Sequence, residues 1–323
     1  FNGEIYNYKE LRKKLNYRKF NSKSDTEVLL YLYEEFGENF VKLLNGIFSF
    51  VIFDKKKNKL IYARDRFGVK PLYLYQDNMK AIFCTEARPI LKINNKFEPN
   101  IEEIKKYISV GTLYDKKKTF FKDIYLHPIS TISEFKLNKF QISKNNKYWT
   151  LKKNKAETCK TFQEFYEKFI IKFRKSLNLN LVSDVKVGLL HSSGTDSNFL
   201  KSFIEKDLKR KIDSYTFGWK NKKYNEIGML KKIGHDIKKK NSISLNGNEI
   251  LKNLKEMIHK CEGPIGGFGT AGLYNLMKII KRNKTKVVLS GEGGDEFFLG
   301  YLNLKVIFLR NLYEKNKELF YLD

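Results

Sequence analysis

The stretch VKVGLLHSSGTDSNFL, residues 185–200, decides how the second half of this chain folds. An apolar run from Val185 to Leu190 stops at a cluster of small polar residues, and a helix-compatible segment follows. This pattern is typical of a strand, a tight loop and a helix that begins at about Ser197. A Ser- and Gly-rich loop exposes backbone N–H groups, and the helix adds the positive end of its dipole. The stretch therefore predicts a loop that binds phosphate groups.

The acidic residue in this loop indicates that a metal ion takes part. No lysine follows the glycine, so the loop is not an ordinary P-loop. Asp196 would repel phosphate unless Mg²⁺ lay between them. A second polar cluster, SGEGGDE at residues 290–296, follows another predicted strand and supplies Asp295. Two aspartates at strand ends, beside a loop of backbone amides, predict a site for a nucleotide pyrophosphate.

Strands and helices alternate around these two clusters. We expect strands at 185–190, 214–217 and 286–289, and helices from about 197, near 225–237, at 249–259 and at 271–281. A further helix is indicated by the spacing of Phe162, Phe165, Phe169, Phe173 and Leu177. Such alternation predicts a parallel, doubly wound α/β sheet, in which ligands bind beyond the carboxyl ends of the strands.

The first 150 residues have a different pattern. Short apolar runs at 47–53, 59–64, 72–75 and 81–84 are separated by polar turns, which predicts antiparallel sheet. Before them, Asp25 is expected to cap a helix that buries Val28, Leu29, Leu32 and Tyr33. The chain therefore reads as an α+β domain at 1–150 and an α/β domain at 151–323.

Composition restricts the class of protein. The 323 residues include three widely spaced cysteines, with no zinc spacing and no disulfide framework, so we expect a reducing cytoplasm. No signal peptide and no apolar run long enough for a bilayer is evident, so no membrane is expected. The net charge of +27 comes from lysines scattered over every segment. Because they are not interleaved with aromatic residues, we interpret them as solvated faces and expect no nucleic acid partner.

Six stretches resemble one known family. HSSGTDS (191–197) resembles the pyrophosphate loop of adenylating ATP pyrophosphatases, and VVLSGEGGDEFFLGY (287–301) resembles the companion motif of glutamine-hydrolysing asparagine synthases. FNGEIYN (1–7), SKSDTEVLLYLYEEFG (22–37), LNGIFSF (44–50) and ARDRFGVKPLY (63–73) resemble the class II glutamine amidotransferase domain of the same family. The resemblance implies an αββα glutaminase joined by an ammonia tunnel to a parallel-sheet ATP-pyrophosphatase domain.

The same resemblance implies a role for individual residues. Asn2 and Gly3 match the oxyanion hole for the glutamine amide, and Glu4 and Asp25 match further glutamine contacts. Glu292 matches a catalytic carboxylate of the synthetase step, and Asp196 and Asp295 match the metal ligands. The ATP contacts would come from Leu190, Ser192, Gly194, Asp196, Ser197, Phe217, Ser290 and Gly291. The implied reaction uses Mg·ATP to adenylate aspartate, and ammonia from glutamine then attacks the acyl carbon. A homodimer is a further expectation.

Three departures from the family pattern bear on these expectations. The family's nucleophile is an N-terminal cysteine, whereas this sequence starts at Phe1, so we expect the chain by itself to lack glutaminase activity. Ser193 stands where the loop has its first glycine, and its Cβ could narrow the approach of phosphate. The sequence stops at Asp323, before a lysine that supports adenylation in the family. We therefore expect a chain truncated at both ends.

Several alternatives stay open. His191 is expected to pack rather than to react, Arg64-Asp65-Arg66 to form a structural ion-pair turn, and Glu296 to cap a helix. The carboxylate that is amidated could belong to a sugar acid or another compound, or the reaction could close a lactam ring. The chain could also be an inactive remnant that binds nucleotide, or a basic nucleic acid binder with strongly salt-dependent affinity.

Overall fold

The structure is a computed structural model that describes residues 1–95, 98–113, 115–151 and 159–315. Contacts within the chain divide it into two units. One comprises Phe1–Ser183 and Ile258–Pro264, and the other comprises Asp184–Met257 and Ile265–Asp323. The assignment of 1–150 and 151–323 as two functional domains remains a prediction.

The first unit contains two antiparallel sheets. The larger has the order β1-β2-β3-β7-β8, with β1 (Asn2–Ile5), β2 (Gly46–Asp54), β3 (Lys59–Arg64), β7 (Thr131–Lys136) and β8 (Gln141–Lys147). The smaller has the order β5-β4-β6, with β4 (Tyr73–Gln76), β5 (Ala81–Cys84) and β6 (Ile124–Leu126). The helices are α1 (Tyr8–Lys14), α2 (Asp25–Phe36), the 3₁₀ segment η1 (Gly37–Leu43), α3 (Ala87–Asn94), α4 (Ile101–Val110) and α5 (Phe162–Asn180).

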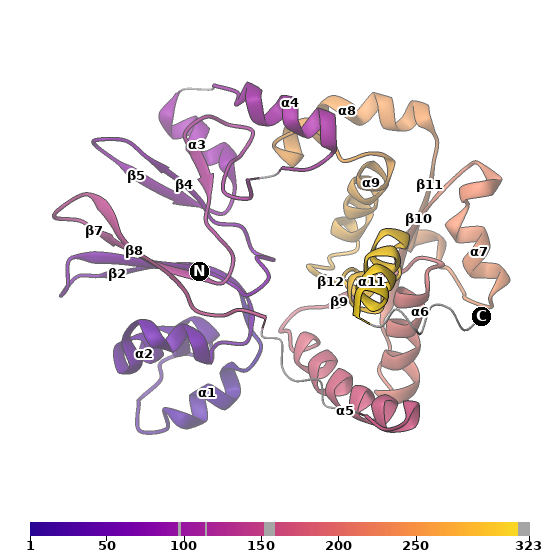
Figure 1. Cartoon of the computed structure of the whole chain (residues 1–323), viewed down its shortest axis with the longest axis horizontal. Helices are drawn as coiled ribbons and strands as arrows, with labels where there is room; N and C mark the ends of the chain where they lie inside the picture. The colour runs from indigo at the N-terminus through magenta and orange to yellow at the C-terminus, as the bar shows by residue number, and fades with distance from the viewer. Residues whose placement is uncertain (96–97, 114, 152–158, 316–323) are drawn as a thin grey trace. The chain divides into compact units, whose positions relative to one another are not determined.

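Apart from α5, these elements form four layers, α–β–β–α. In Figure 1, α1 and α2 lie on the outer side of the larger sheet, and α3 and α4 lie beyond the smaller one. Three hydrophobic clusters hold the layers together. One joins α1 and α2 to the larger sheet, one centred on Tyr62 and Phe135 lies between the sheets, and one around Ile90 joins α3 to the smaller sheet. The α+β prediction is thereby confirmed.

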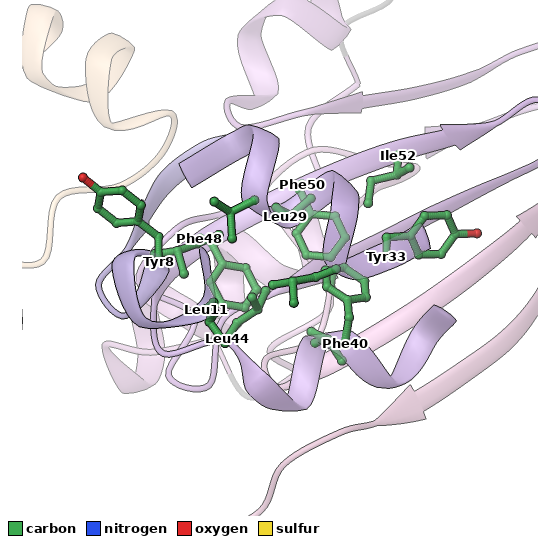
Figure 2. Close-up of a cluster of buried hydrophobic side chains, with 14 of the residues drawn as sticks. Tyr8, Leu11, Leu29, Tyr33, Phe40, Leu44, Phe48, Phe50 and Ile52 are labelled. Atoms are coloured by element: carbon green, nitrogen blue, oxygen red, sulfur yellow. The ribbon is translucent and has the colours of Figure 1, made fainter. Parts of the chain in front are cut away.

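The cluster beneath α2 follows from the sequence pattern (Figure 2). Phe48, Phe50 and Ile52 alternate along β2, so their side chains share the face that meets the helices. Val28, Leu29, Leu32 and Tyr33 are buried as predicted. The predicted cap is wrong, because Ser24 is the N-cap and accepts the Thr26 N–H at 3.1 Å. Asp25 is the first residue of the helix, and its carboxylate is used elsewhere.

The second unit is built on a parallel sheet of order β11-β10-β9-β12. Its strands are β9 (Val187–Leu190), β10 (Asp213–Trp219), β11 (Ser242–Leu245) and β12 (Val287–Leu289). Its helical segments are α6 (Thr195–Ser202), the π turn η2 (Phe203–Asp207), η3 (Lys222–Tyr224), α7 (Glu226–Lys232), η4 (Lys239–Asn241), α8 (Gly247–Cys261, which belongs to this unit as far as Met257), α9 (Phe268–Arg282), α10 (Gly294–Phe298) and α11 (Leu302–Lys315). The α/β class predicted for this half is confirmed.

Helices cover both faces of β10. Tyr215 and Phe217 point toward α9, where Leu276 and Ile280 complete a buried cluster. On the opposite face, Gly218 leaves room for α7, since a Cβ there would lie 3.3 Å from the Ile227 side chain. The predicted helix near 225–237 ends at Lys232, because Gly234 turns the backbone to φ +86°. No helix in the described part of the chain is long and apolar enough to cross a membrane.

Candidate functional site

The strand order places a cavity between two loops of the second unit. The chain leaves β9 toward β10 and β11 on one side, and β12 returns on the other side of β9. The sheet therefore has a topological switch point between β9 and β12, where doubly wound proteins bind ligands. A cavity of about 560 Å³ lies there. Its lining includes every residue for which a role at the ATP, metal or synthetase site was predicted, namely Leu190, Ser192, Gly194, Asp196, Ser197, Phe217, Ser290, Gly291, Glu292 and Asp295.

The loop after β9 is held by hydrogen bonds from its own backbone amides. Ser192 N–H donates to Ser197 Oγ at 3.1 Å, and Gly194 N–H donates to Ser192 Oγ at 3.2 Å. Ser193 N–H donates to Glu226 Oε2 at 2.6 Å. The sequence predicts N–H groups that are exposed for phosphate, but at these three residues each N–H already donates to a hydroxyl or carboxylate oxygen of the protein. The first N–H groups of α6, which have no partner within the helix, remain as donors.

The two polar loops lie directly against each other. A Cβ on Gly294 would fall 2.2 Å from Asp196 Oδ2, and one on Gly291 would fall 2.9 Å from Asp196 Cβ. Likewise, a Cβ on Gly300 would fall 1.8 Å from Asp295 Oδ1. The SGEGGDE glycines therefore serve close packing around the aspartates. This packing brings Asp196 and Asp295, which are distant in sequence, to the same cavity.

Several carboxylates of the cavity lining lie near Tyr301. The carboxylates of Glu296, Asp295, Glu292 and Asp196 all raise the pKa of the Tyr301 hydroxyl. Glu296 lies in the first turn of α10, but the N-cap is Gly293, so the predicted capping role of Glu296 is wrong. Such a cluster of carboxylates favours a cation.

The donor set fits Mg²⁺ that is shared with phosphate. In the described residues, no group of three or more His, Cys, Asp or Glu side chains could hold a metal ion. Asp196 and Asp295 alone would leave most of an octahedral shell to phosphate oxygens and water. Mg²⁺ is commonly bound in this way, by one or two carboxylates and the phosphates of a substrate.

Other residues of the cavity lining form an apolar end. Leu190 ends β9 and Phe217 lies within the neighbouring strand β10, and Leu273 and Leu276 face them from α9. Gly272 allows this approach, since a Cβ there would lie 2.3 Å from the Phe217 ring. A flat, apolar base would fit between such side chains.

His191 packs beneath the loop, as predicted. Its ring is buried, lies edge-on to His235 at 4.7 Å between centroids, and pairs through Nε2 with Asn198 Oδ1 at 3.0 Å. Burial is the main cause that lowers the pKa of His191, so the ring stays neutral near pH 7. A neutral, packed ring serves the loop's shape rather than proton transfer.

In the first unit, the predicted glutamine contacts lie along an edge strand. Asn2, Gly3 and Glu4 pair with Ser49, Phe48 and Ile47 of β2. A Cβ on Gly3 would lie 2.1 Å from the Ile47 carbonyl oxygen, and Gly3 has φ +149°. Glycine is therefore required for β1 to lie this close to β2.

Asp25 joins this strand to α2. Its Oδ2 accepts the Ile5 N–H at 2.9 Å, which holds the half-buried carboxylate beside the end of β1. Its Oδ1 has only long contacts, at 3.5 Å, with the Ser24 and Thr26 hydroxyls. The structure therefore brings Asp25 to the segment that contains Asn2, Gly3 and Glu4, and Oδ1 can accept a further donor.

The loop at 64–70 supports the same strands, but not as an ion-pair turn. The buried Asp65 carboxylate accepts the N–H groups of Phe48, Phe67, Val69 and Lys70 at 3.0–3.2 Å. Arg64 donates instead to the carbonyls of Lys70, His127 and Gly68. The ion-pair prediction is therefore wrong, because both charged groups are satisfied by backbone.

Tyr6 was not predicted from the sequence. Burial, followed by the charges of Glu4 and Asp65, raises the pKa of Tyr6 to about 12. The hydroxyl therefore stays protonated near the predicted glutamine contacts. Only its place in the FNGEIYN stretch could have drawn attention to it.

Two sequence families match this chain. A glutamine amidotransferase domain matches residues 1–149, and an asparagine synthase domain matches residues 169–317. Both halves of the chain therefore resemble the glutamine-hydrolysing asparagine synthases. The resemblance inferred from the motifs is thereby confirmed.

Members of this family from bacteria, archaea and animals align along most of the chain. Asparagine synthetase [glutamine-hydrolyzing] 1 of Bacillus subtilis is 30% identical over 93% of this chain and 47% of its own length. A putative asparagine synthetase [glutamine-hydrolyzing] 2 of Methanocaldococcus jannaschii is 34% identical over 94% of this chain and 58% of its own length. The human asparagine synthetase [glutamine-hydrolyzing] is 27% identical over 94% of this chain and 54% of its own length. The chain thus spans about half the length of these curated relatives.

The two family matches divide the candidate sites between them. The glutamine amidotransferase match contains Asn2, Gly3, Glu4 and Asp25, and the asparagine synthase match contains the whole lining of the switch-point cavity. Sequence reasoning missed Glu226, Thr270, Leu273 and Tyr301 in that lining. Glu226 shows no motif, whereas Tyr301 ends the quoted stretch 287–301.

Proposed function

We propose that this chain takes part in glutamine-dependent asparagine synthesis. ATP would adenylate the side-chain carboxylate of aspartate with release of pyrophosphate, and ammonia from glutamine would attack the acyl carbon to give asparagine and AMP. The observation that supports this most directly is the switch-point cavity, where the loops after β9 and β12 meet around Asp196 and Asp295. The proposal assigns the glutaminase role to 1–150 and the synthetase role to 151–323.

The cavity suggests how ATP would lie. The adenine would rest at the apolar end, beside the backbone of Leu190 and Phe217. The phosphates would reach Ser192, Gly194 and Ser197 on one side and Ser290 and Gly291 on the other. Mg²⁺, held by Asp196 and Asp295, would supply positive charge to the pyrophosphate leaving group. Glu292, also in the cavity, would then face the reacting end of the nucleotide.

The edge strand suggests how glutamine would be held. Because β1 is at the edge of its sheet, alternate N–H groups point away from β2 and are open to a ligand. The Asn2 side chain and the Gly3 N–H would stabilise the oxyanion formed from the glutamine amide. Asp25 Oδ1 would accept from the α-ammonium group, while Oδ2 keeps its bond to Ile5.

Two experiments test the proposal. Calorimetry on the chain should show ATP binding that depends on Mg²⁺ and is lost in EDTA. Incubation with aspartate, Mg·ATP and an ammonium salt, which supplies ammonia without glutamine hydrolysis, should yield asparagine and AMP in equal amounts. A chain that binds no Mg·ATP would contradict the nucleotide site. Amide formation with a sugar acid, but not with aspartate, would instead show that the acceptor is wrong.

We also propose that the partners are small molecules and that the enzyme works in the cytoplasm without nucleic acid or membrane. The three free cysteines support a reducing compartment. The catalysed reaction needs no macromolecular partner.

A further inference from the structure

Glu226 reaches out of its own helix into the phosphate loop. It is the first residue of α7, yet the helix is capped by Asn225, whose side chain accepts the Gly228 N–H at 2.9 Å. Glu226 is therefore not needed to cap α7. Its carboxylate extends to Ser193 instead and accepts the N–H of that residue at 2.6 Å, a short, charge-assisted bond. Glu226 also lines the switch-point cavity.

Ser193 lies between Ser192 and Gly194, which both line the cavity, so a phosphate seated in this loop would have to share the Ser193 N–H with this carboxylate. The neighbouring amides, those of Ser192 and Gly194, are bonded to serine hydroxyls, which are neutral and can rotate. Glu226 differs because its carboxylate is negatively charged and occupies the place where a phosphate oxygen would accept the same N–H. One N–H cannot serve both a carboxylate and a phosphate at full strength, and the two negative groups repel each other.

We propose that Glu226 is a built-in competitor of pyrophosphate for the Ser193 N–H. It would occupy the loop amide until the nucleotide displaces it, and would return to that amide as pyrophosphate leaves. Glu226 would thus weaken the binding of ATP and of the pyrophosphate product and hasten the release of that product. Glu226 would affect ligand binding indirectly, through the amide of Ser193 in the loop, so we describe it as a positioning residue. This inference rests on the proposed function, since it takes the cavity to be a nucleotide site.

The test uses a probe that reaches only the phosphate part of the site. Inorganic pyrophosphate with Mg²⁺, ATP with Mg²⁺, and adenosine are each titrated into the chain and into Glu226→Gln. The glutamine side chain keeps the shape of glutamate and a neutral oxygen acceptor, but it carries no negative charge. Pyrophosphate and ATP should bind about tenfold more tightly, the difference between a charged and a neutral acceptor, while adenosine should be unaffected.

Glu249→Gln is a matched control. Glu249 also accepts a backbone N–H at short range, that of Asn246 at 2.7 Å, but this bond closes the first turn of α8 and lies outside the cavity lining. Its substitution should change no ligand affinity. Circular dichroism checks that each variant folds. If Glu226→Gln does not fold, Glu226→Ala replaces it, and this variant should also bind pyrophosphate more tightly than the unaltered chain.

The outcomes separate this inference from the proposed function. If the unaltered chain binds neither Mg·ATP nor pyrophosphate, both fail. If it binds them and Glu226→Gln leaves the affinities unchanged, or weakens them, only the competitor role is refuted. Tightening of adenosine together with pyrophosphate would also refute it, because a general change in the cavity would then be the cause.

Discussion

At Gly3, the backbone of β1 comes so close to β2 that the strand pair has no room for a side chain. The Ile47 carbonyl oxygen lies 2.1 Å from the position that a Cβ would take. The neighbour is backbone and cannot turn aside as a flexible side chain would. The predicted oxyanion residue is therefore also a structural one.

Gly3→Ala should destabilise the first unit by about 2–4 kcal/mol, since it adds steric overlap to an unfavourable φ. Urea denaturation followed by circular dichroism measures this change. Gly111→Ala is the control, because Gly111 has φ +75° but no atom within 4 Å of its Cβ position. That variant should cost only about 1–2 kcal/mol. Equal losses for the two variants would contradict the steric explanation.

Asp196→Asn and Asp295→Asn should each weaken Mg·ATP binding by about tenfold or more, because each removes a charged group that we propose as a metal ligand. Neither should lower the melting temperature without ligand, since each reduces repulsion among the carboxylates around Tyr301. Calorimetry and thermal melts measure the two effects. Asp184→Asn, at an exposed aspartate outside the cavity, should bind ATP normally. ATP that binds equally well in EDTA would show that the aspartates hold no metal.

Site residues that belong to a sequence motif could be predicted. Residues that reach the site from a distant position in the sequence could not. Asp196, Ser290 and Asp295 stand out because polar clusters that follow apolar strands have few structural uses. Glu226 lies 33 positions from Ser193, and nothing in the sequence shows that its side chain returns to the loop. Asp65 was misjudged for a related reason. Its arginine neighbours suggest ion pairs, whereas its partners are backbone amides that only the folded loop presents.

Between elements, a buried ion pair fastens the larger sheet of the first unit. Lys59 at the start of β3 bonds to Glu134 of β7 and to Glu38 of η1. Burial by itself would raise the pKa of Glu134. Hydrogen bonds from Lys59 and Ser143, with the charges of Lys59 and Lys144, outweigh burial and lower the pKa to about 2. The folded sheet therefore holds this carboxylate in its ionised form.

The pH dependence of stability follows from this shift. The pKa of Glu134 is lower in the folded than in the unfolded chain, so its stabilisation is complete above about pH 4.5 and is lost as the pH falls toward 2. Glu134→Gln should cost about 2–4 kcal/mol at pH 7, because it leaves Lys59 without its closest partner. The deficit relative to the unaltered chain should shrink on acidification, as measured by urea denaturation from pH 7 to pH 3.

A surface ion pair provides the comparison. Glu98→Gln, which removes an exposed partner of Lys122, should change stability by less than about 1 kcal/mol. His127 adds an acid effect of its own, because burial lowers its pKa to about 4, so stability falls between about pH 6.5 and 4 in all variants. A deficit for Glu134→Gln that stays constant with pH would show that the carboxylate is not the titrating group.

Elements bounded by turn residues could be predicted closely from the sequence. Strands β3 and β5 begin and end where expected, because apolar runs meet polar turns at both ends. Strand β8 was missed because QISKNNK has almost no apolar residues, and β11 was missed because SISL contains only two apolar residues and so forms no apolar run. Both are edge strands, so pairing with one neighbour rather than their own apolar content defines them.

At the scale of the whole molecule, each unit has its own buried core and its own candidate site. The cavity is lined by residues of the second unit alone, and β1 and Asp25 belong to the first. Ligand binding stabilises the part that forms the site, by about 2.7 kcal/mol at a concentration one hundred times Kd.

Mg·ATP should therefore slow amide hydrogen exchange in the second unit and leave 1–149 unchanged. Hydrogen exchange with mass spectrometry measures this difference, and the largest protection is expected at 190–198 and 289–296. Mg²⁺ without nucleotide is the control and should protect neither unit strongly. Equal protection of both units by Mg·ATP would contradict binding confined to the second.

The strand order of the second unit also has a consequence for biosynthesis. β12 pairs with β9, whose residues lie about one hundred positions earlier, and only this pairing brings Asp295 beside Asp196. Contacts of such long sequence separation form late, because a long loop must close first. A nascent chain that had emerged only through β11 would contain the Asp196 loop without its partner. Nucleotide binding should therefore appear abruptly when β12 and α10 have left the ribosome, and ATP would then report that this sheet is complete.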